Sequence, residues 1–229
     1  MTNLIPLNKP SRLIQWTVWG GLGLVIIGIF LAFAVSRIKP ATVPMPVLGQ
    51  LPDFHLTNQL NEPITLASLK GQVWVADVIF TRCPSICIKM TRQMAQLQST
   101  LPAGLPVRLV SLTTDPDFDT PNILKRYGSN VGANPDRWWF LTGMEQDLIN
   151  LEAKGFKFSV MGKAPADREV PDDRIIHSTF FMLVDQQGRV RGWTDQQGQT
   201  HFYFDTEDPD SQKRMLGAIS QLLSESAKP

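Results

Sequence analysis

The stretch that decides the fold runs from residue 73 to residue 87 and reads Val73-Trp74-Val75-Ala76-Asp77-Val78-Ile79-Phe80-Thr81-Arg82-Cys83-Pro84-Ser85-Ile86-Cys87. Its first half is almost continuously apolar, which is typical of a strand that is covered on both faces of a sheet. Pro84 suits the first position of a helix, and apolar side chains follow at helical spacing, at Met90, Met94, Leu97 and Leu101. We therefore expect a buried strand, with Cys83 at its C-terminal end, followed by a helix that begins at Pro84 and contains Cys87.

The rest of the chain after residue 50 alternates strand and helix patterns around this segment. Two short strands about a turn are expected within residues 51–66, and further strands at 107–112, 138–142, 179–185 and 189–193. Helices are expected at 121–127, 145–154 and 212–224. Strand–helix alternation that ends in a hairpin and a last helix predicts one α/β domain with a mixed sheet.

The N-terminal part has a different composition. No residue from Ile14 to Val35 is charged, and a run of about 22 apolar residues can cross a hydrocarbon core about 30 Å thick. We expect a cytoplasmic tail at 1–13, a transmembrane anchor at 14–35, a Pro-rich linker at 36–50 and the α/β domain at 51–229.

The alternative for this segment is a cleavable signal peptide, because Ala32-Phe33-Ala34 resembles a cleavage site. In either case the domain lies outside the cytoplasm. With the anchor retained, the protein is a single-pass protein of the inner (cytoplasmic) membrane, and its domain lies on the extracytoplasmic side, in the periplasm or its equivalent. The chain has 22 basic and 21 acidic residues, a balance that does not indicate nucleic-acid binding.

Cys83 and Cys87 are the only cysteines, and they form a C-x-x-x-C pair. On a regular helix their Cβ atoms are about 5–6 Å apart, whereas a disulfide favours about 3.8 Å. Two thiolates on one metal, with bonds of about 2.3 Å for zinc, tolerate the wider separation. The spacing favours a metal and leaves a disulfide open. The amino end of the helix, with Arg82 and Lys89, is expected to stabilise both thiolates.

His177 is the candidate third ligand, because it directly precedes a predicted strand and follows a loop rich in Pro, Gly and charge, residues 161–174. The alternative is a structural histidine at a strand end. His55 is expected to be a hairpin residue and His201 to be a loop residue, neither of them a ligand. By ligand softness, two thiolates and an imidazole suit Cu(I) first and zinc second, and they also allow Cu(II).

Four further residues have alternative interpretations. Met90 and Met94 could be thioether ligands, but a methionine stripe at helical spacing indicates core. Asp115 and Asp119 follow the second central strand and share the sheet edge with the cysteines. Turn and N-cap chemistry before Pro121 accounts for the pair Asp119-Thr120. Asp115 is either a turn residue or a group that supports the metal ligands.

Three motifs occur in order that resemble the Sco/SenC family: Thr-x-Cys-Pro-x-x-Cys at Thr81–Cys87, the Thr114–Pro121 segment with its paired aspartates, and His177-Ser178 before a later strand. The N-terminal apolar segment and the Leu-Pro-x-Phe-x-Leu entry at Leu51–Leu56 are also similar, and the resemblance covers about residues 48–225. One departure is Ile88, where the family usually has proline after the second cysteine.

The resemblance implies a thioredoxin-like mixed sheet flanked by helices, on a membrane tether. It further implies a copper ion held by Cys83, Cys87 and His177, with Asp115 in support. The function implied is assistance in assembling the dinuclear copper centre of cytochrome c oxidase, whose copper-acceptor subunit is then the partner.

Three hypotheses follow for the cysteine site. The first is a non-enzymatic copper metallochaperone. The second is a thiol–disulfide oxidoreductase that reduces the cysteines of a copper acceptor by exchange at Cys83 and Cys87, with His177 dispensable. The third is a peroxidase, because Phe80-Thr81-Arg82-Cys83-Pro84 resembles a peroxidatic cysteine site.

Overall fold

The computed structural model describes residues 12–36, 44–157 and 179–226. The chain forms two compact units, residues 1–43 and residues 44–229. In the first unit the described part is the helix α1, Arg12–Ser36. Its segment Trp16–Phe33 is long and apolar enough to cross a membrane and is not buried by the protein. A signal sequence near an N-terminus has the same properties, so both interpretations of this helix remain open.

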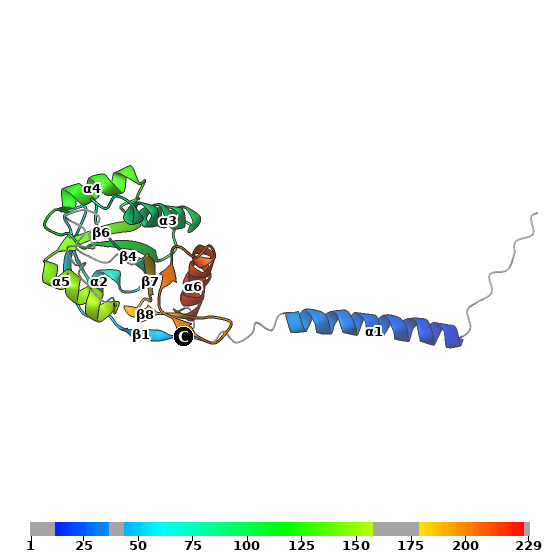
Figure 1. Ribbon diagram of the computed structural model, residues 1–229. Coiled ribbons are helices and arrows are strands. Elements are labelled where there is room, and N and C mark those ends of the chain that lie inside the picture. Colours follow the sequence, from blue (N-terminus) through cyan, green and yellow to red (C-terminus); the bar gives the residue numbers. More distant parts are fainter. Residues whose placement is uncertain (1–11, 37–43, 158–178, 227–229) are drawn as a thin grey trace, which may run out of the picture. The chain divides into compact units, whose positions relative to one another are not determined.

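The second unit is an α/β domain built on one large sheet (Figure 1). Its strands are β1 (Val47–Gln50), β2 (His55–Asn58), β3 (Pro63–Thr65), β4 (Val73–Ile79), β5 (Val107–Thr113), β6 (Trp138–Gly143), β7 (Phe180–Val184), β8 (Arg189–Arg191) and β11 (Phe204–Asp205). A separate small ribbon pairs β9 (Trp193–Thr194) with β10 (Thr200–His201). The helical elements are α2 (Leu66–Leu69), α3 (Ile86–Thr100), α4 (Pro121–Asn130), α5 (Glu145–Asn150), the π-helix η1 (Leu151–Gly155) and α6 (Ser211–Ser226).

The strand order of the large sheet is β1-β8-β7-β4-β5-β6-β2-β3, with β11 on β7. The three central strands β4, β5 and β6 run parallel, and the outer pairs are antiparallel. In the β4–β5 register, Asp77 lies opposite Ser111. The helices α3 and α4 are the crossovers between the parallel strands, so the loops after β4 and β5 meet at one edge of the sheet.

Helices flank the sheet (Figure 1), and an apolar core lies on each of its faces. Side chains of α3, α4 and α6 form one core with alternate residues of the central strands, among them Val75, Leu109 and Phe140. On the other face, α2, α5 and η1 pack on Trp74, Val110 and Leu141. The mixed sheet flanked by helices therefore agrees with the prediction from the strand–helix alternation.

Several boundaries differ from the sequence prediction. The helix expected at Pro84 begins at Ile86, because the residues before it form a loop that the adjoining β5–α4 segment holds in place. The stretch predicted as a tether contains β1, which pairs with β8, while residues 37–43 lie outside the described part. The predicted helix 145–154 is split between α5 and the π-helix η1. Strands β9, β10 and β11 were not predicted.

Candidate metal centre

The two cysteines lie at the edge of the sheet where β4 and β5 end. Parallel pairing continues just beyond the strands, since the amide of Thr114 donates to the carbonyl of Ile79 at 3.0 Å. The loop from Phe80 to Ser85 begins there with a turn, in which the Cys83 amide donates to the Phe80 carbonyl at 3.2 Å. Cys83 is therefore in the loop, and Cys87 is in the first turn of α3.

Both sulfurs are largely withdrawn from solvent: Cys83 is 5% exposed and Cys87 is 1% exposed. The amide of Cys87 donates to the sulfur of Cys83 at 3.4 Å, and no disulfide joins the two residues. An N–H from the start of a helix thus reaches one sulfur, as the sequence analysis expected. That interaction favours the thiolate form of Cys83.

Cys87 behaves differently from the prediction that both thiolates are stabilised. Its hydrogen bond with Cys83, followed by burial, raises the pKa of Cys87 well above the ordinary range of a thiol. The amino end of α3 does not offset these effects, because Cys87 points into the protein from within the first turn. The pair is therefore asymmetric, and Cys87 retains its proton more strongly.

Asp119 fastens the cysteine loop to the end of β5. Its side chain is fully buried, and it accepts hydrogen bonds from the Thr81 amide at 3.0 Å and from the Thr113 hydroxyl at 2.5 Å. The hydroxyl of Thr81 donates to the second carboxylate oxygen. Thr120 is the N-cap of α4, and the Asp119 amide closes a turn on the carbonyl of Asp115, as predicted for the Asp119-Thr120 pair. The prediction missed the role of the Asp119 carboxylate, which faces the cysteine loop.

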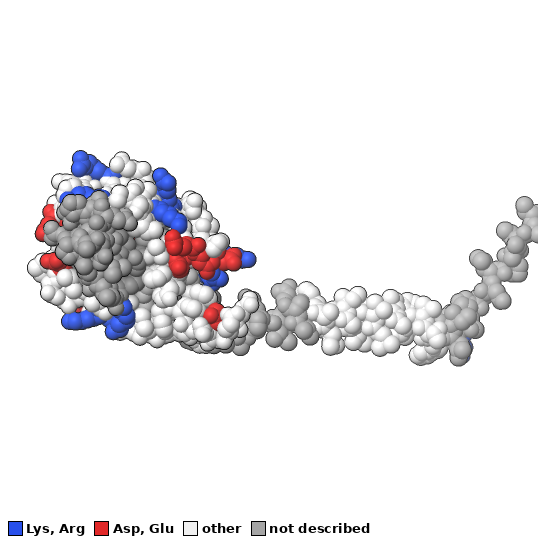
Figure 2. Space-filling view, viewed as in Figure 1, with Lys and Arg blue, Asp and Glu red and all other residues white. Residues whose placement is uncertain are grey.

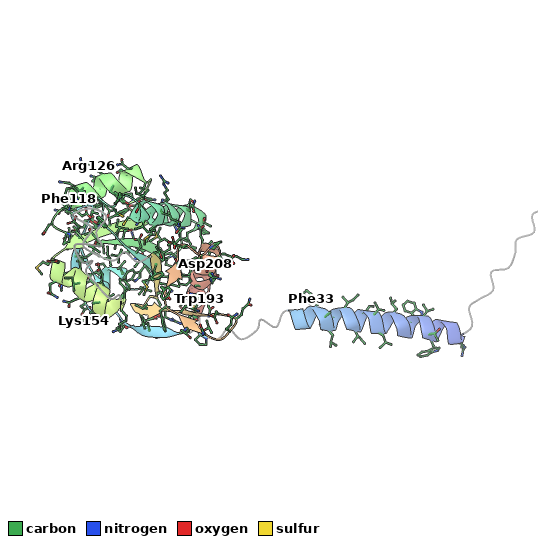
Figure 3. All side chains as sticks on the ribbon, viewed as in Figure 1. Phe33, Phe118, Arg126, Lys154, Trp193 and Asp208 are labelled. Atoms are coloured by element: carbon green, nitrogen blue, oxygen red, sulfur yellow. The ribbon has the colours of Figure 1, made fainter. Side chains whose placement is uncertain are left out.

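Arg82 and Asp115 form a second link between the same two loops. The guanidinium Nη2 lies 2.7 Å from Oδ2 of Asp115, and Nε lies 3.2 Å from the same oxygen. The guanidinium also covers the ring of Phe118, 4.2 Å from its centroid, which Figure 3 labels on the β5–α4 side of the domain. Asp115 therefore acts on the residue that precedes Cys83. A direct role of Asp115 beside a metal stays a prediction.

The candidate third ligand, His177, lies outside the described residues, as does the loop 161–174 before it. Among the residues that the structure describes, no three His, Cys, Asp or Glu side chains are grouped so that they could hold a metal. His55 is an exposed hairpin residue on β2, as expected. His201 was predicted to be a loop residue, but it lies in β10, where Nε2 contacts Oδ2 of Asp195 at 2.8 Å and the ring stacks on Trp193.

The buried side of the site holds one carboxyl that the sequence analysis did not single out. Met90 and Met94 are fully buried core residues, as expected. Asp77 is also fully buried, and neither of its oxygens has a well-aligned hydrogen bond within the described structure. Burial raises the pKa of Asp77 to about 7, although Ser111 opposite it lowers the pKa in part. The sequence does contain a signal for this buried carboxyl, because Asp77 is an acidic residue inside an otherwise apolar strand.

Known proteins resemble this chain over most of the domain. The SCO1/SenC family model matches residues 49–206. A SCO1 protein homolog of Bacillus subtilis is 40% identical over 147 residues, which cover 63% of this chain and 73% of the relative. A solved structure of BsSco, whose study concerns a disulfide switch in a member of the Sco family of cytochrome c oxidase assembly proteins, is 31% identical. It covers 78% of this chain and 96% of its own, with a TM-score of 0.63.

A more distant structure is ScoI of Bradyrhizobium japonicum with copper bound, at 18% identity and a TM-score of 0.58. It covers 76% of this chain and 99% of its own. At that identity the likeness concerns the fold. The arrangement of sheet and helices is accordingly the thioredoxin-like one of the Sco structures.

Proposed function

Since the chain belongs to the SCO1/SenC family, we propose that its domain binds one copper ion through Cys83, Cys87 and His177. The observation that supports this most is the sulfur pair, in which an amide of α3 donates to one sulfur and a four-residue spacing keeps the second within the same turn. Thiolates select soft ions, and Cu(I) stands first among those compatible with an added imidazole. Asp115 supports the ligands by holding Arg82.

The copper is cargo in this proposal. The protein is a metallochaperone that assists assembly of the dinuclear copper centre of cytochrome c oxidase and delivers the ion to the copper-acceptor subunit. Residues 14–35 are the anchor in the inner (cytoplasmic) membrane and 1–13 the cytoplasmic tail. The linker predicted at 36–50 ends before residue 44, because β1 belongs to the domain. Residues 44–229 are the copper-binding domain on the extracytoplasmic side. The apolar helix α1 and the family membership support this arrangement.

Copper retention tests the proposal. The fragment 44–229, which forms a compact unit by itself, is reduced, loaded anaerobically with Cu(I) and dialysed against a weak chelator. We expect one copper per protein for wild type, loss of copper in Cys83→Ser/Cys87→Ser, and weaker binding with altered copper spectra in His177→Ala. The matched control is His201→Ala, which removes a histidine bound to Asp195. One copper retained by the double cysteine variant contradicts the proposal.

The proximity of the two sulfurs favours a second candidate, a thiol–disulfide oxidoreductase that reduces the acceptor's cysteines. The hydrogen bond between the thiols places one within reach of the other, so the Cys83 thiolate can attack an acceptor disulfide and Cys87 can resolve the mixed disulfide. The acceptor is reduced and the pair becomes a disulfide. This candidate predicts that His177→Ala keeps full exchange activity and full function. Loss of function with exchange activity intact contradicts it.

A further inference from the structure

The two helices next to the cysteines carry charges of one sign. α3 contains Lys89 and Arg92, α4 contains Lys125 and Arg126, and neither helix has an aspartate or a glutamate. Lys89 is paired with Glu207 at 3.4 Å, whereas the other three cations form no ion pair with a described residue. Figure 2 shows blue atoms over the region where Figure 1 places α3 and α4. These two helices therefore carry four cations and no carboxylate, in a chain with a net charge of +1.

A groove of about 500 Å³ lies between these helices. Its apolar lining comes from Ile88, Ala95 and Val131, and its other lining residues are Arg92, Gln96, Asn130 and the half-buried Tyr127. Ile88 is 39% exposed, although it directly follows the buried Cys87. An apolar cavity with one cation and two amides on its walls suits one inserted apolar side chain flanked by carboxylates.

The groove is connected to the cysteine site by hydrogen bonds. The hydroxyl groups of Tyr127 and Thr91 are 2.8 Å apart, and the Thr91 hydroxyl donates to the carbonyl of Cys87 at 2.7 Å. A molecule seated against Tyr127 therefore lies within about one helical turn of Cys87. A protein that docks in the groove is therefore placed close to the cysteine site.

We propose that the α3–α4 groove is the docking site for an acidic segment of the partner protein. The partner inserts one apolar side chain beside Ile88, and its carboxylates pair with Arg92 on the groove wall and with Arg126, which lies one helical turn before the groove residue Asn130. The proposal rests on the proposed function only in that the partner must approach the cysteine loop. A protein segment suits this surface better than an anionic membrane, because Ala95 and Val131 are recessed between two helices where a bilayer surface does not reach them.

Peptide binding to the full chain in phosphatidylcholine nanodiscs tests the proposal. The probe is a fluorescent glutamate-rich peptide with one central leucine, followed by anisotropy. We expect saturable binding that weakens with salt and falls about tenfold in Arg92→Glu/Arg126→Glu, since two surface ion pairs are lost. Ala95→Trp, which fills the groove without a change in charge, is also expected to weaken binding.

The matched control is Lys70→Glu/Lys154→Glu, which makes the same change in net charge at exposed sites on the opposite helical layer. Equal weakening in this control, or unchanged binding in Arg92→Glu/Arg126→Glu, overturns the proposal. Competition by phosphatidylglycerol vesicles as strong as that by the unlabelled peptide also overturns it and assigns the face to lipid. Copper stoichiometry measured on the same variants separates the two proposals. Arg92→Glu/Arg126→Glu should leave it intact, whereas Cys83→Ser/Cys87→Ser should lose copper and still bind the peptide.

Discussion

At the scale of single residues, the carboxylate of Asp119 determines where the cysteine loop lies. It accepts hydrogen bonds from two hydroxyl groups and one amide that would otherwise bind water. All three donors belong to residues at the ends of β4 and β5. Because the group is fully buried, its removal leaves these donors without their acceptor, and it leaves the buried hydroxyl of Thr113 without solvent as well.

We expect Asp119→Ala to lower the free energy of unfolding by about 2–4 kcal/mol. Urea unfolding of the reduced fragment 44–229 at pH 7 measures the change. Asp117→Ala is the control, since Asp117 lies in the same loop but is exposed, and its effect should stay within about 0.5 kcal/mol. Similar losses in both variants would mean that the loop as a whole, and not the buried carboxylate, carries the stability.

Asp77 makes stability depend on pH. Burial raises its pKa from 3.8 to about 7 in the folded protein, so the folded state binds this proton more strongly than the unfolded state. Its contribution to stability is therefore complete below about pH 4 and is lost as the pH rises through about 7. Asp77→Asn keeps the shape and cannot ionise. Relative to wild type, the free energy of unfolding of Asp77→Asn should increase between pH 4.5 and pH 8 by on the order of 2–4 kcal/mol.

Urea unfolding of the reduced proteins at the two pH values checks this expectation. Asp117→Asn, an exposed change in the sequence neighbourhood of the site, should show no such dependence. If Asp77→Asn differs from wild type by the same amount at both values, Asp77 does not titrate in this range in the folded protein.

The residue scale also shows where sequence reasoning ends. The cysteine pair could be found because its spacing is local. The role of Asp119 could not, because its position before Pro121 suits an N-cap, whereas its partner Thr81 is 38 residues away. Asp77 interrupts an apolar strand, which is visible in the sequence, but only the β4–β5 register shows that it faces Ser111. The assignment of His177 lies outside the described residues and stays a prediction.

At the scale of elements, β1 closes the sheet at a position that the sequence suggested was a tether. The short strand could not be recognised in this proline-rich sequence, because it forms through pairing with β8 and not through local propensity. The residues around it are also anchored. Buried Arg191 donates to the carbonyl of Met45 and to Asp185 and Glu225, and the Met45 amide donates to Glu225. The long elements were predictable because strong periodicity is a local signal, whereas β9, β10 and β11 have two residues each.

A fragment that begins at residue 51 should therefore be less stable than one that begins at residue 44. It loses the buried side chain of Met45, and it leaves Arg191 and Glu225 with fewer partners at the edge of β8. We expect a decrease on the order of 3 kcal/mol in the free energy of unfolding. Thermal unfolding of the two fragments, both reduced, measures it. Equal midpoints of thermal unfolding for the two fragments would show that the pairing of β1 with β8 does not stabilise the domain.

At the scale of the whole molecule, the two compact units have different properties. The first contains the apolar segment Trp16–Phe33 of α1, and the second contains the two cysteines. The division could be predicted because a long uncharged segment is recognisable from composition alone. In the proposed function the anchor confines the domain to the membrane that contains its acceptor. Confinement raises the effective concentration of the domain at the acceptor without any new contact.

Release of the domain from the membrane should therefore weaken delivery and not copper binding. If a cleavable signal peptide replaces residues 1–43, the freed domain should bind copper as before, because its core and cysteine site lie within residues 44–229. It should need about 10- to 100-fold more protein to restore the copper content of cytochrome c oxidase in a deletion strain. An unrelated single-pass anchor joined to residues 37–229 is the matched control and should restore delivery at low expression. If the freed domain works as well as the anchored one at equal low levels, α1 serves export alone, and the signal-peptide interpretation of this helix gains its first support.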